Sequence, residues 1–447
     1  MGAPTPFFLA GPNLVLSLIG LLSRVDKDPP RDWSAATIDV VIPCHNEEAT
    51  LVFCLEALFA QTLQPARIVV LDDGSQDRTR QVAEAYAASC GRAIEVQSVE
   101  CSRGKTPGVK RSARRLDGDV LFVLDGDTVL REPEYIERAV RALWDGDRIA
   151  SACGGVLPLR RTDRDARVAR PDVSAFYAAH PGLPHVKQRG RGAFFLHEYV
   201  NLYRDFLYSF LRSLTYRSQM ALFGTIVNPI GCAVAYRRAC LRDVFDAYED
   251  RLGDNLTTSE DIFLGFAFLD RGYRNVLVDG IFVLSEEPFL QRLPRQTFLW
   301  SSSFLQSCYY FPDLVFSPFK ALRRRRLRRE GGEAGHGPDG AAHTARYGRP
   351  IGWSILFGLI EKISLPVVVL MLALMREWTL LALTLTIEIA GVMLIVTLVG
   401  EMRRRPGQIW KAVVATPLRY VVMLFDLAVV LRFATDVWVV RDFRWRK

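Results

Sequence analysis

The cysteines of this chain lack the spacing that metal centres and disulfide frameworks need. None of the eight belongs to a CxxC pair, and several lie inside apolar runs; they are Cys44, Cys54, Cys90, Cys101, Cys153, Cys232, Cys240 and Cys308. A scattered set argues against a zinc site and against the disulfide-rich class of secreted proteins. We therefore expect reduced, partly buried thiols in a cytosolic domain.

Histidine is scarce, and the basic residues are not interleaved with aromatic ones. Among the six histidines, His180, His185 and His197 are spaced too irregularly for a metal site. The net charge of +8 gathers in a run of arginines at 323–329, which lacks aromatic side chains on which bases stack. A solvated or lipid-facing tail explains this run better, so we expect no nucleic-acid partner.

Apolar and charged residues are both abundant. Apolar residues make up 49% of the 447 residues, which is high for a soluble enzyme, while charged residues still make up 24%. The length suits one large domain or two modest ones. This mixture predicts a water-soluble domain joined to membrane segments.

An apolar stretch near the N-terminus has its positive charges on one side only. Residues 7–22 are apolar apart from Asn13 and Ser17, and three basic residues follow between 24 and 31. A cleaved signal peptide would carry its charges ahead of the stretch. By the positive-inside rule, we expect a helix in the cell membrane with the N-terminus outside and the next domain in the cytoplasm.

Three further apolar stretches follow Arg349, at 365–375, 380–400 and 413–440. Only the middle one has the composition of a clean span of about 20 residues. Glu361 and Lys362 precede the first stretch, so we expect its start to lie along the interface. The last stretch predicts either a span lining a polar path or an amphipathic surface helix, because four ionisable residues interrupt it; they are Arg419, Asp426, Arg432 and Asp436.

Short β-branched runs alternate with amphipathic stretches from Thr37 to Leu130. The predicted strands are 38–42, 67–71, 94–99 and 120–124, and the predicted helices between them are 47–60, 77–88 and 107–116. This order predicts an α/β fold with a mainly parallel sheet, whose ligands bind beyond the carboxyl ends of the strands. Further helices are expected at 197–214 and from Ser259, a good N-cap, to Gly272.

These patterns divide the chain into four parts. Residues 1–31 form a transmembrane helix with its juxtamembrane link, and residues 32–310 form a cytoplasmic α/β domain. Residues 311–350 are a basic, glycine-rich linker. Residues 351–447 hold the C-terminal transmembrane and interfacial helices.

Acidic residues gather at the predicted strand ends. Asp72 follows the second strand, and Asp125 and Asp127 follow the fourth, with only Gly126 between them. Carboxylates on one rim repel one another unless a cation lies among them. Two acids one residue apart can reach one hard cation, Mg²⁺ or Mn²⁺, which would offset the charge of a diphosphate. Most such triplets are solvated turns, but the position after a buried-type strand favours the metal-binding interpretation.

Four segments in order resemble successive motifs of the inverting family-2 glycosyltransferases; they are Val41–Glu47, Val70–Asp77, Arg103–Lys105 and Leu124–Thr128. The resemblance implies a GT-A-type domain that binds a nucleotide sugar. It implies that Asp72 contacts the base, that Lys105 lies near the diphosphate, and that Asp125 and Asp127 hold the metal. Three residues would frame the base and ribose, namely Pro43, Asn46 and Glu47.

The second half of the domain is similar to membrane polysaccharide synthases of the hyaluronan, chitin and cellulose synthase type. The segments that carry this likeness are His197–Tyr199, Asn228–Ala233, Tyr236–Arg238 and Thr258–Asp261. The resemblance places Gly231 and Cys232 on the acceptor side and the general base at Glu260 and Asp261. An acceptor hydroxyl must lose a proton as it attacks the sugar, and Asp261 is our candidate base. The alternative is that the two acids cap a helix dipole.

One motif departs from that family. The synthases carry Gln-x-x-Arg-Trp before the membrane region, whereas this chain has Gln296 and Trp300 with Leu299 in the arginine position. Arg292 or Arg295 is the expected substitute for the missing charge. Trp300 would stack on the acceptor sugar, and its alternative role is an interfacial anchor.

Three functions follow from these observations. The leading hypothesis is a membrane glycosyltransferase that adds a sugar from a nucleotide diphosphate donor, a UDP-sugar, to a growing glycan and couples this to membrane passage. The second is single-sugar transfer to a lipid such as polyprenyl phosphate. The third is a non-catalytic membrane scaffold with a decayed transferase domain, against which the intact acids argue.

Overall fold

The computed structural model of the chain describes residues 12–23, 31–146, 148–185, 191–249, 259–319, 350–399 and 407–437. Several features expected from the sequence lie outside these residues: the arginine run, the glycine-rich part of the linker, Thr258, and the first residues of the N-terminal apolar stretch.

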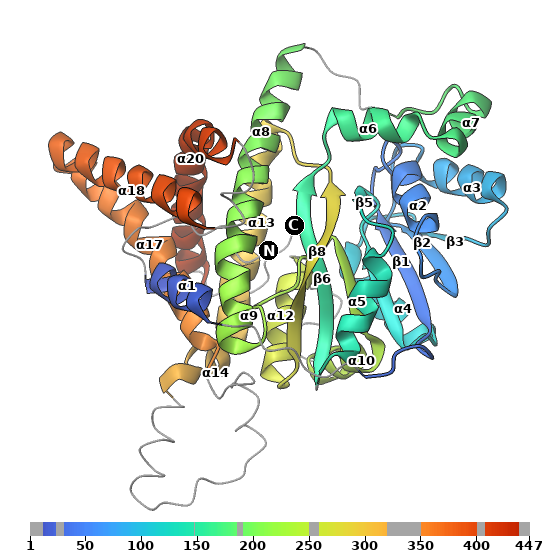
Figure 1. Ribbon diagram of the computed structural model, residues 1–447, viewed down its shortest axis with the longest axis horizontal. Helices are drawn as coiled ribbons and strands as arrows, with labels where there is room; N and C mark the ends of the chain where they lie inside the picture. Colours follow the sequence, from blue (N-terminus) through green and yellow to red (C-terminus); the bar gives the residue numbers. More distant parts are fainter. Residues whose placement is uncertain are drawn as a thin grey trace, which may run out of the picture.

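One sheet of eight strands forms the core of the described residues between 31 and 319 (Figure 1). Its strands are β1 (Ile38–Cys44), β2 (Arg67–Asp72), β3 (Glu95–Ser98), β4 (Val120–Leu124), β5 (Thr128–Leu130), β6 (Ile149–Pro158), β7 (Ala233–Arg237) and β8 (Arg274–Ser285). The four strands predicted from the sequence are confirmed to within two residues at each end.

The strand order is β3-β2-β1-β4-β7-β6-β8-β5. Strands β3, β2, β1 and β4 pair in parallel, whereas β7 runs antiparallel to both β4 and β6. The chain moves outward from β1 through β2 to β3 and then returns to the other side of β1 with β4. This reversal makes the carboxyl ends of β1 and β4 a topological switch point, where open α/β sheets bind their ligands.

Helices cover both faces of the sheet; in chain order up to the last strand they are α2 (Leu51–Phe59), α3 (Thr79–Cys90), α4 (Lys105–Arg115), α5 (Tyr135–Trp144), α6 (Arg161–Val168), α7 (Pro171–Ala179), α8 (Arg191–Phe210), η1 (Leu211–Tyr216), α9 (Arg217–Phe223), α10 (Arg238–Ala247) and α12 (Glu260–Asp270). The helix expected from Glu47 begins only at Leu51. Asn46 has a left-handed φ of 62°, and the backbone N–H of Glu47 donates to Thr79 Oγ1, so these residues form a turn instead.

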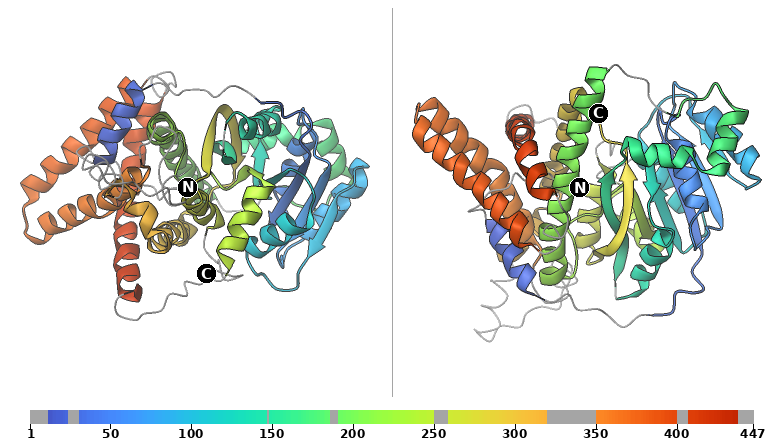
Figure 2. Two further views of the ribbon diagram at one scale, coloured as in Figure 1. Left: turned by 90° about the horizontal axis from the view of Figure 1, so that it is seen from below. Right: turned by 45° about the horizontal axis from the view of Figure 1, so that its top comes forward.

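The continuous segment α8–η1–α9 separates the sheet from the C-terminal helices, as two views agree (Figures 1 and 2). It packs against β6 on one side and against α20 (Gln408–Thr435) on the other. Beside it run η3 (Leu290–Arg292) and α13 (Leu293–Tyr310), followed by α14 (Pro312–Val315). Helix α13 also contacts α12 and α20, so it joins the sheet domain to the membrane candidates.

Three described helices are long and apolar enough to cross a membrane: α17 (Gly352–Leu374), α18 (Trp378–Leu398) and α20. The sequence analysis expected a clean span only in the second of the three apolar stretches. The first stretch is a candidate as well, because α17 begins at Gly352, well before residue 365. Lys362 is buried inside the helix bundle, where its Nζ lies 3.0 Å from Asp426 Oδ2 and donates to Ser301 Oγ at 2.9 Å. A polar partner inside the bundle makes a lysine compatible with a spanning helix.

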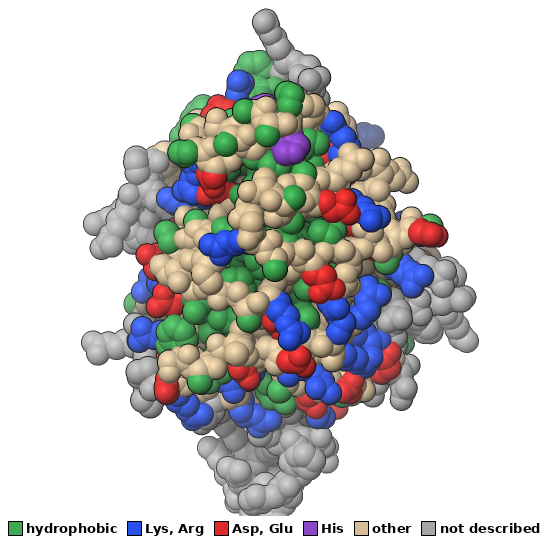
Figure 3. Space-filling model, turned by 90° about the vertical axis from the view of Figure 1, so that its right-hand side faces the viewer, with side chains coloured by type: hydrophobic (Ala, Val, Ile, Leu, Met, Phe, Trp, Pro, Cys, Tyr) green, Lys and Arg blue, Asp and Glu red, His purple; other side chains and the backbone are tan. Residues whose placement is uncertain are grey.

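The short helix α1 (Pro12–Leu22) packs against α9 and α17. The opposite side of the molecule carries acidic and basic side chains interspersed over its surface (Figure 3). By contrast, α17 and α18 expose apolar side chains such as Leu374, Trp378 and Leu398. The two ends of the molecule therefore suit different surroundings, water on one side and an apolar medium on the other.

Candidate active site

Two cavities open along the carboxyl ends of the strands, and Lys105 lines both of them. The larger has a volume of about 1110 Å³ and the smaller about 250 Å³. Lys105 is the first residue of α4 and follows Gly104, whose φ of 86° makes the sharp turn into the helix. A ligand that filled both cavities would pass this ammonium group.

The larger cavity holds part of the expected nucleotide side. Pro43 and Asp72 line it, together with basic residues of α4 and the preceding loop, namely Arg103, Lys110, Arg111, Arg114 and Arg115. Asp72 Oδ1 accepts a hydrogen bond from the backbone N–H of Ser75 at 3.1 Å. Asp73 and Glu249 line it as well, and Glu249 pairs with Lys110 and Arg114. The lining therefore mixes acids and cations and suits a base and an anionic group together. These basic residues were not expected from the sequence, because only the packing of α4 against the sheet brings them to one wall of the cavity.

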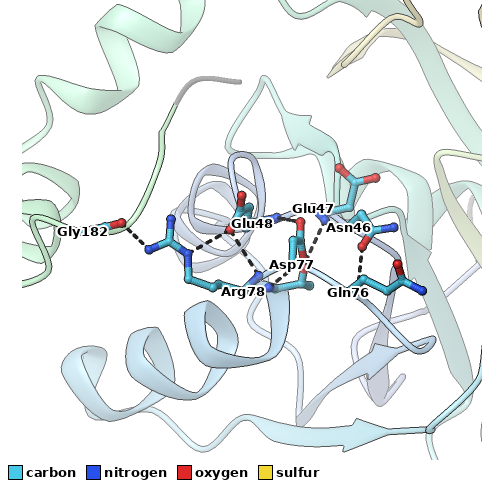
Figure 4. A network of polar contacts seen from close by, with 8 residues as sticks. Asn46, Glu47, Glu48, Gln76, Asp77, Arg78 and Gly182 are labelled. Atoms are coloured by element: carbon cyan, nitrogen blue, oxygen red, sulfur yellow. Dashed lines mark hydrogen bonds and ion pairs between the residues drawn. The ribbon is translucent and has the colours of Figure 1, made fainter. Parts of the chain in front are cut away.

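Asn46 and Glu47 take part in a turn beside this cavity rather than in the lining described for it (Figure 4). The Asn46 side chain accepts a hydrogen bond from the backbone N–H of Gln76 at 2.8 Å. The Glu47 carboxylate accepts one from Thr50 Oγ1 at 3.1 Å. The Asn46 contact joins the loop after β1 to the loop after β2, whereas the Glu47–Thr50 contact lies within the loop after β1. Both residues therefore shape the rim.

Asp125 and Asp127 lie together in the smaller cavity. The backbone N–H of Asp125 donates to Cys232 O at 2.9 Å, and that of Gly126 donates to Pro43 O at 3.1 Å. A Cβ added at Gly126 would lie 2.5 Å from Cys44 Sγ. The small residue between the acids is therefore required by packing against β1, and it brings both carboxylates to the switch point.

Lys105 is held among acids. Its Nζ lies 2.6 Å from Asp125 Oδ1 and 2.6 Å from Glu260 Oε1, and it donates to Gly231 O at 3.1 Å. Burial alone would lower the pKa of Lys105, but the two carboxylates raise it well above its ordinary value. Lys105 therefore stays charged and offsets Asp125, one of the acids expected at the strand ends, together with Glu260 of α12.

Glu260 and Asp261 form the first turn of α12, with Ser259 at the N-cap position as expected. The Ser259 side chain makes no capping hydrogen bond, whereas its backbone N–H donates to Ser303 Oγ at 2.9 Å. Asp261 Oδ2 accepts a hydrogen bond from the backbone N–H of Gly231 at 3.2 Å. Glu260, Asp261, Gly231 and Cys232 all line the smaller cavity. The expected base therefore lines the same cavity as the paired aspartates.

The remaining wall comes from α8, α13 and the residues that follow β8. Gln296, Leu299 and Trp300 line the smaller cavity, as do Tyr208, Glu286 and Glu287. Burial raises the pKa of Glu287 to about 7, helped by Asp127 and Glu286 and opposed by Arg204 and Tyr208. Neither Arg292 nor Arg295 is among the described lining residues. The guanidinium that contacts Gln296 and Trp300 belongs instead to Arg204 of α8, which was not among the residues expected from the sequence.

The acids fit a hard divalent cation only in part. Within the described residues, no group of three or more His, Cys, Asp and Glu side chains is arranged to hold a metal ion. Mg²⁺, however, is commonly bound by one or two carboxylates, with substrate phosphates and water completing its shell. Asp125 and Asp127 are such a pair, so their oxygen ligands suit a cation that arrives with a phosphorylated ligand.

Comparison with known proteins finds a family model that matches part of the sheet domain. Residues 39–245 match the model described as Glycosyl transferase family 2. That region contains β1, β2 and β4 with their strand-end acids. This match and the observed sheet confirm the expected GT-A-type α/β fold.

Individual relatives are distant. An N-acetylglucosaminyltransferase of Azorhizobium caulinodans is 27% identical over 273 residues, covering 60% of this chain and 59% of the relative. An undecaprenyl-phosphate 4-deoxy-4-formamido-L-arabinose transferase of Serratia proteamaculans is 30% identical over 112 residues, covering 24% and 34%. A solved mannosyltransferase from Pyrobaculum calidifontis aligns over 92% of this chain and 94% of its own, with a TM-score of 0.45 and 16% identity. The chain thus spans less than two thirds of the length of these curated relatives.

Proposed function

We propose, from the premise that residues 39–245 form a glycosyltransferase family 2 domain, that this chain is a membrane glycosyltransferase. It transfers a sugar from a nucleoside diphosphate donor, a UDP-sugar, to a growing glycan with inversion at the anomeric carbon. The reaction takes place on the cytoplasmic side, and α17, α18 and α20 hold the enzyme in the cell membrane.

The observation that carries this proposal is the pair of adjoining cavities with Lys105 between them. The larger one has room and charge for a nucleotide, with Asp72 toward the base. The smaller one has carboxylates and an indole ring, which suit sugar hydroxyls and sugar faces. A donor that spans both cavities would bring its diphosphate to Lys105 and its sugar toward Asp261.

In the proposed reaction, Asp261 accepts the proton of an acceptor hydroxyl while that oxygen forms a bond to the anomeric carbon. The bond from this carbon to the diphosphate oxygen breaks on the opposite side, and the nucleoside diphosphate leaves with the electron pair. Lys105 offsets the negative charge of the leaving group. Glu260 keeps Lys105 in place through their 2.6 Å ion pair.

Asp125 and Asp127 would hold Mg²⁺ or Mn²⁺. Bound there, the cation would act as a Lewis acid on the phosphate oxygens. The fit rests on their oxygen ligands and on their place beside Lys105 in the smaller cavity.

A second candidate is transfer of one sugar to a lipid carrier such as polyprenyl phosphate. The observation in its favour is Leu299, an apolar side chain in the cavity wall on a helix that also contacts α20. An acceptor chain could approach the site from the membrane along this helix. A catalytically inactive scaffold is disfavoured because Lys105, Asp125, Glu260 and Asp261 make an ordered charged site.

A product assay tests the proposal. The detergent-purified chain is incubated with Mn²⁺, total membrane lipid and a panel of radiolabelled UDP- and GDP-sugars. Label in high-mass material supports glycan extension, whereas label extracted into organic solvent supports the lipid acceptor. The absence of nucleotide release with every donor would overturn the enzymatic proposal.

A further inference from the structure

We propose that Arg204 of α8 is a positioning residue for sugar transfer, which holds Gln296, Trp300 and Glu287 in the wall of the smaller cavity. This inference rests on the proposed function. It concerns how the acceptor side of the cavity keeps its shape when leucine occupies position 299.

Arg204 contacts three wall residues from behind. Its Nη2 donates to Gln296 Oε1 at 2.5 Å, and its Nε lies 3.4 Å from Glu287 Oε2. Its guanidinium carbon lies 4.4 Å from the centre of the Trp300 ring. The arginine itself is 1% exposed, whereas all three partners line the cavity. Its influence on a bound sugar therefore passes through these three side chains.

The guanidinium suits this place better than an ammonium would. It is planar and carries donors in a fixed fork, so it can bind an amide oxygen and a carboxylate while its face stacks on an indole. Gln296 and Trp300 lie four residues apart on α13, so one planar group behind the helix can orient both. A lysine would keep the charge but lose the stacking and the fork.

Glu287 is a buried acid that requires a cation beside it, and Arg204 supplies that cation. The carboxylate is 3% exposed, and Tyr208 donates a hydrogen bond to its Oε2 at 3.2 Å. A buried carboxylate left without a cation takes up a proton or draws in water. Either change would alter the hydrogen bonds that Glu287 offers to a sugar in the cavity.

The test compares Arg204→Lys with wild type, using the donor that turns over fastest in the panel. Two quantities are measured together: nucleotide release, and label that enters the glycan or lipid product. We expect kcat for transfer to fall about 100-fold, since displacement of a positioned group by about 1 Å has that effect. The KM for the donor should stay within about twofold, and a larger share of the donor should be lost to water.

Arg212→Lys is the matched control. Arg212 is a buried arginine in η1, the continuation of the same helical segment, and its guanidinium carbon lies 4.6 Å from the centre of the Phe282 ring. We expect it to leave the ratio of transfer to nucleotide release unchanged. If both variants change that ratio equally, or if Arg204→Lys changes only its thermal midpoint, Arg204 has a structural role and the inference is overturned.

A double variant tests whether Arg204 acts through Gln296. If Arg204 acts through Gln296, then Arg204→Lys with Gln296→Ala should transfer sugar no more slowly than the slower single variant. Strictly multiplicative losses would refute that route. Loss of all activity in wild type would refute the proposed function instead, so the two failures are distinguishable.

Discussion

Gly231 lies where a single methyl group would displace the candidate base. A Cβ built at this position would lie 2.5 Å from Asp261 Oδ2, 2.6 Å from its Cγ and 2.7 Å from its Cβ. Non-bonded atoms settle at about 3.5 Å or more, so Asp261 would have to withdraw by about 1 Å. The φ of Gly231 lies outside the left-handed region, so the effect of Gly231→Ala is steric rather than a backbone penalty.

We expect Gly231→Ala to lower kcat for transfer by about 100-fold, or about 2.7 kcal/mol of transition-state stabilisation. A base that no longer reaches the acceptor hydroxyl can no longer lower the activation barrier. Donor binding should remain, because Asp72 and the α4 residues line the larger cavity, to which Gly231 does not contribute within the described lining. Calorimetric titration with UDP and Mn²⁺ measures that binding directly, and product formation gives kcat.

Gly192→Ala is the control for an added methyl group. Gly192 lies in α8, and a Cβ there meets nothing within 4 Å. It should keep wild-type kcat and a thermal midpoint at or above that of wild type. If Gly231→Ala also kept wild-type kcat while folded, Asp261 would not be the base.

Three further predictions use other parts of the molecule. Asp127→Asn should abolish divalent-dependent nucleotide release, measured with and without Mn²⁺, because one of the two carboxylates is lost; residual metal-stimulated release at the wild-type rate would contradict this. Asp426→Asn should lower the thermal midpoint in detergent, because Lys362 loses its buried charged partner at a cost of about 3 kcal/mol. The double variant Lys362→Met with Asp426→Leu removes both charges and should restore most of the lost thermal midpoint. Glu287→Gln should flatten the pH dependence of stability. In the folded protein the pKa of Glu287 is about 7, above its usual 4.5, so the wild-type free energy of unfolding falls by about 3 kcal/mol as pH rises from 4.5 to 7. The variant has no carboxyl group at this position and should not show this loss. Thermal midpoints at pH 5 and pH 8 measure the difference.

The local parts of the fold were predictable, because periodicity and strand-end acids are local signals. The parallel pairing of β1, β2 and β4 follows from alternating strands and helices, and it brings Asp72 and Asp125 to one edge. The antiparallel pairing of β7 was not predictable, since no short turn joins it to β4. The start of α2 was also missed, because the turn at Asn46 is fixed by the Ser75 hydroxyl and the Gln76 backbone N–H, about thirty residues away in the sequence.

The site shows the same division. Lys105, Asp125 and Asp261 were identified from motifs, but their ion pairs and hydrogen bonds come from three separate elements. Arg204 carried no sequence signal as a partner of Gln296, because the two residues meet only through the packing of α8 against the α13 region. Arg204 is also not the only polar residue buried on this segment, where Asn201, Asp205 and Arg212 are buried too, so its residue type alone does not single it out.

Helix α13 links the membrane candidates to the proposed reaction. Trp300 lines the smaller cavity, and the next residue, Ser301, contacts both Lys362 of α17 and Asp426 of α20. Adjacent residues on a helix point about 100° apart, so one turn of α13 presents the indole to the sugar side and the hydroxyl to the helix bundle. A shift of α17 or α20 that moved this ion pair would therefore also move the part of α13 that carries Trp300 in the cavity wall.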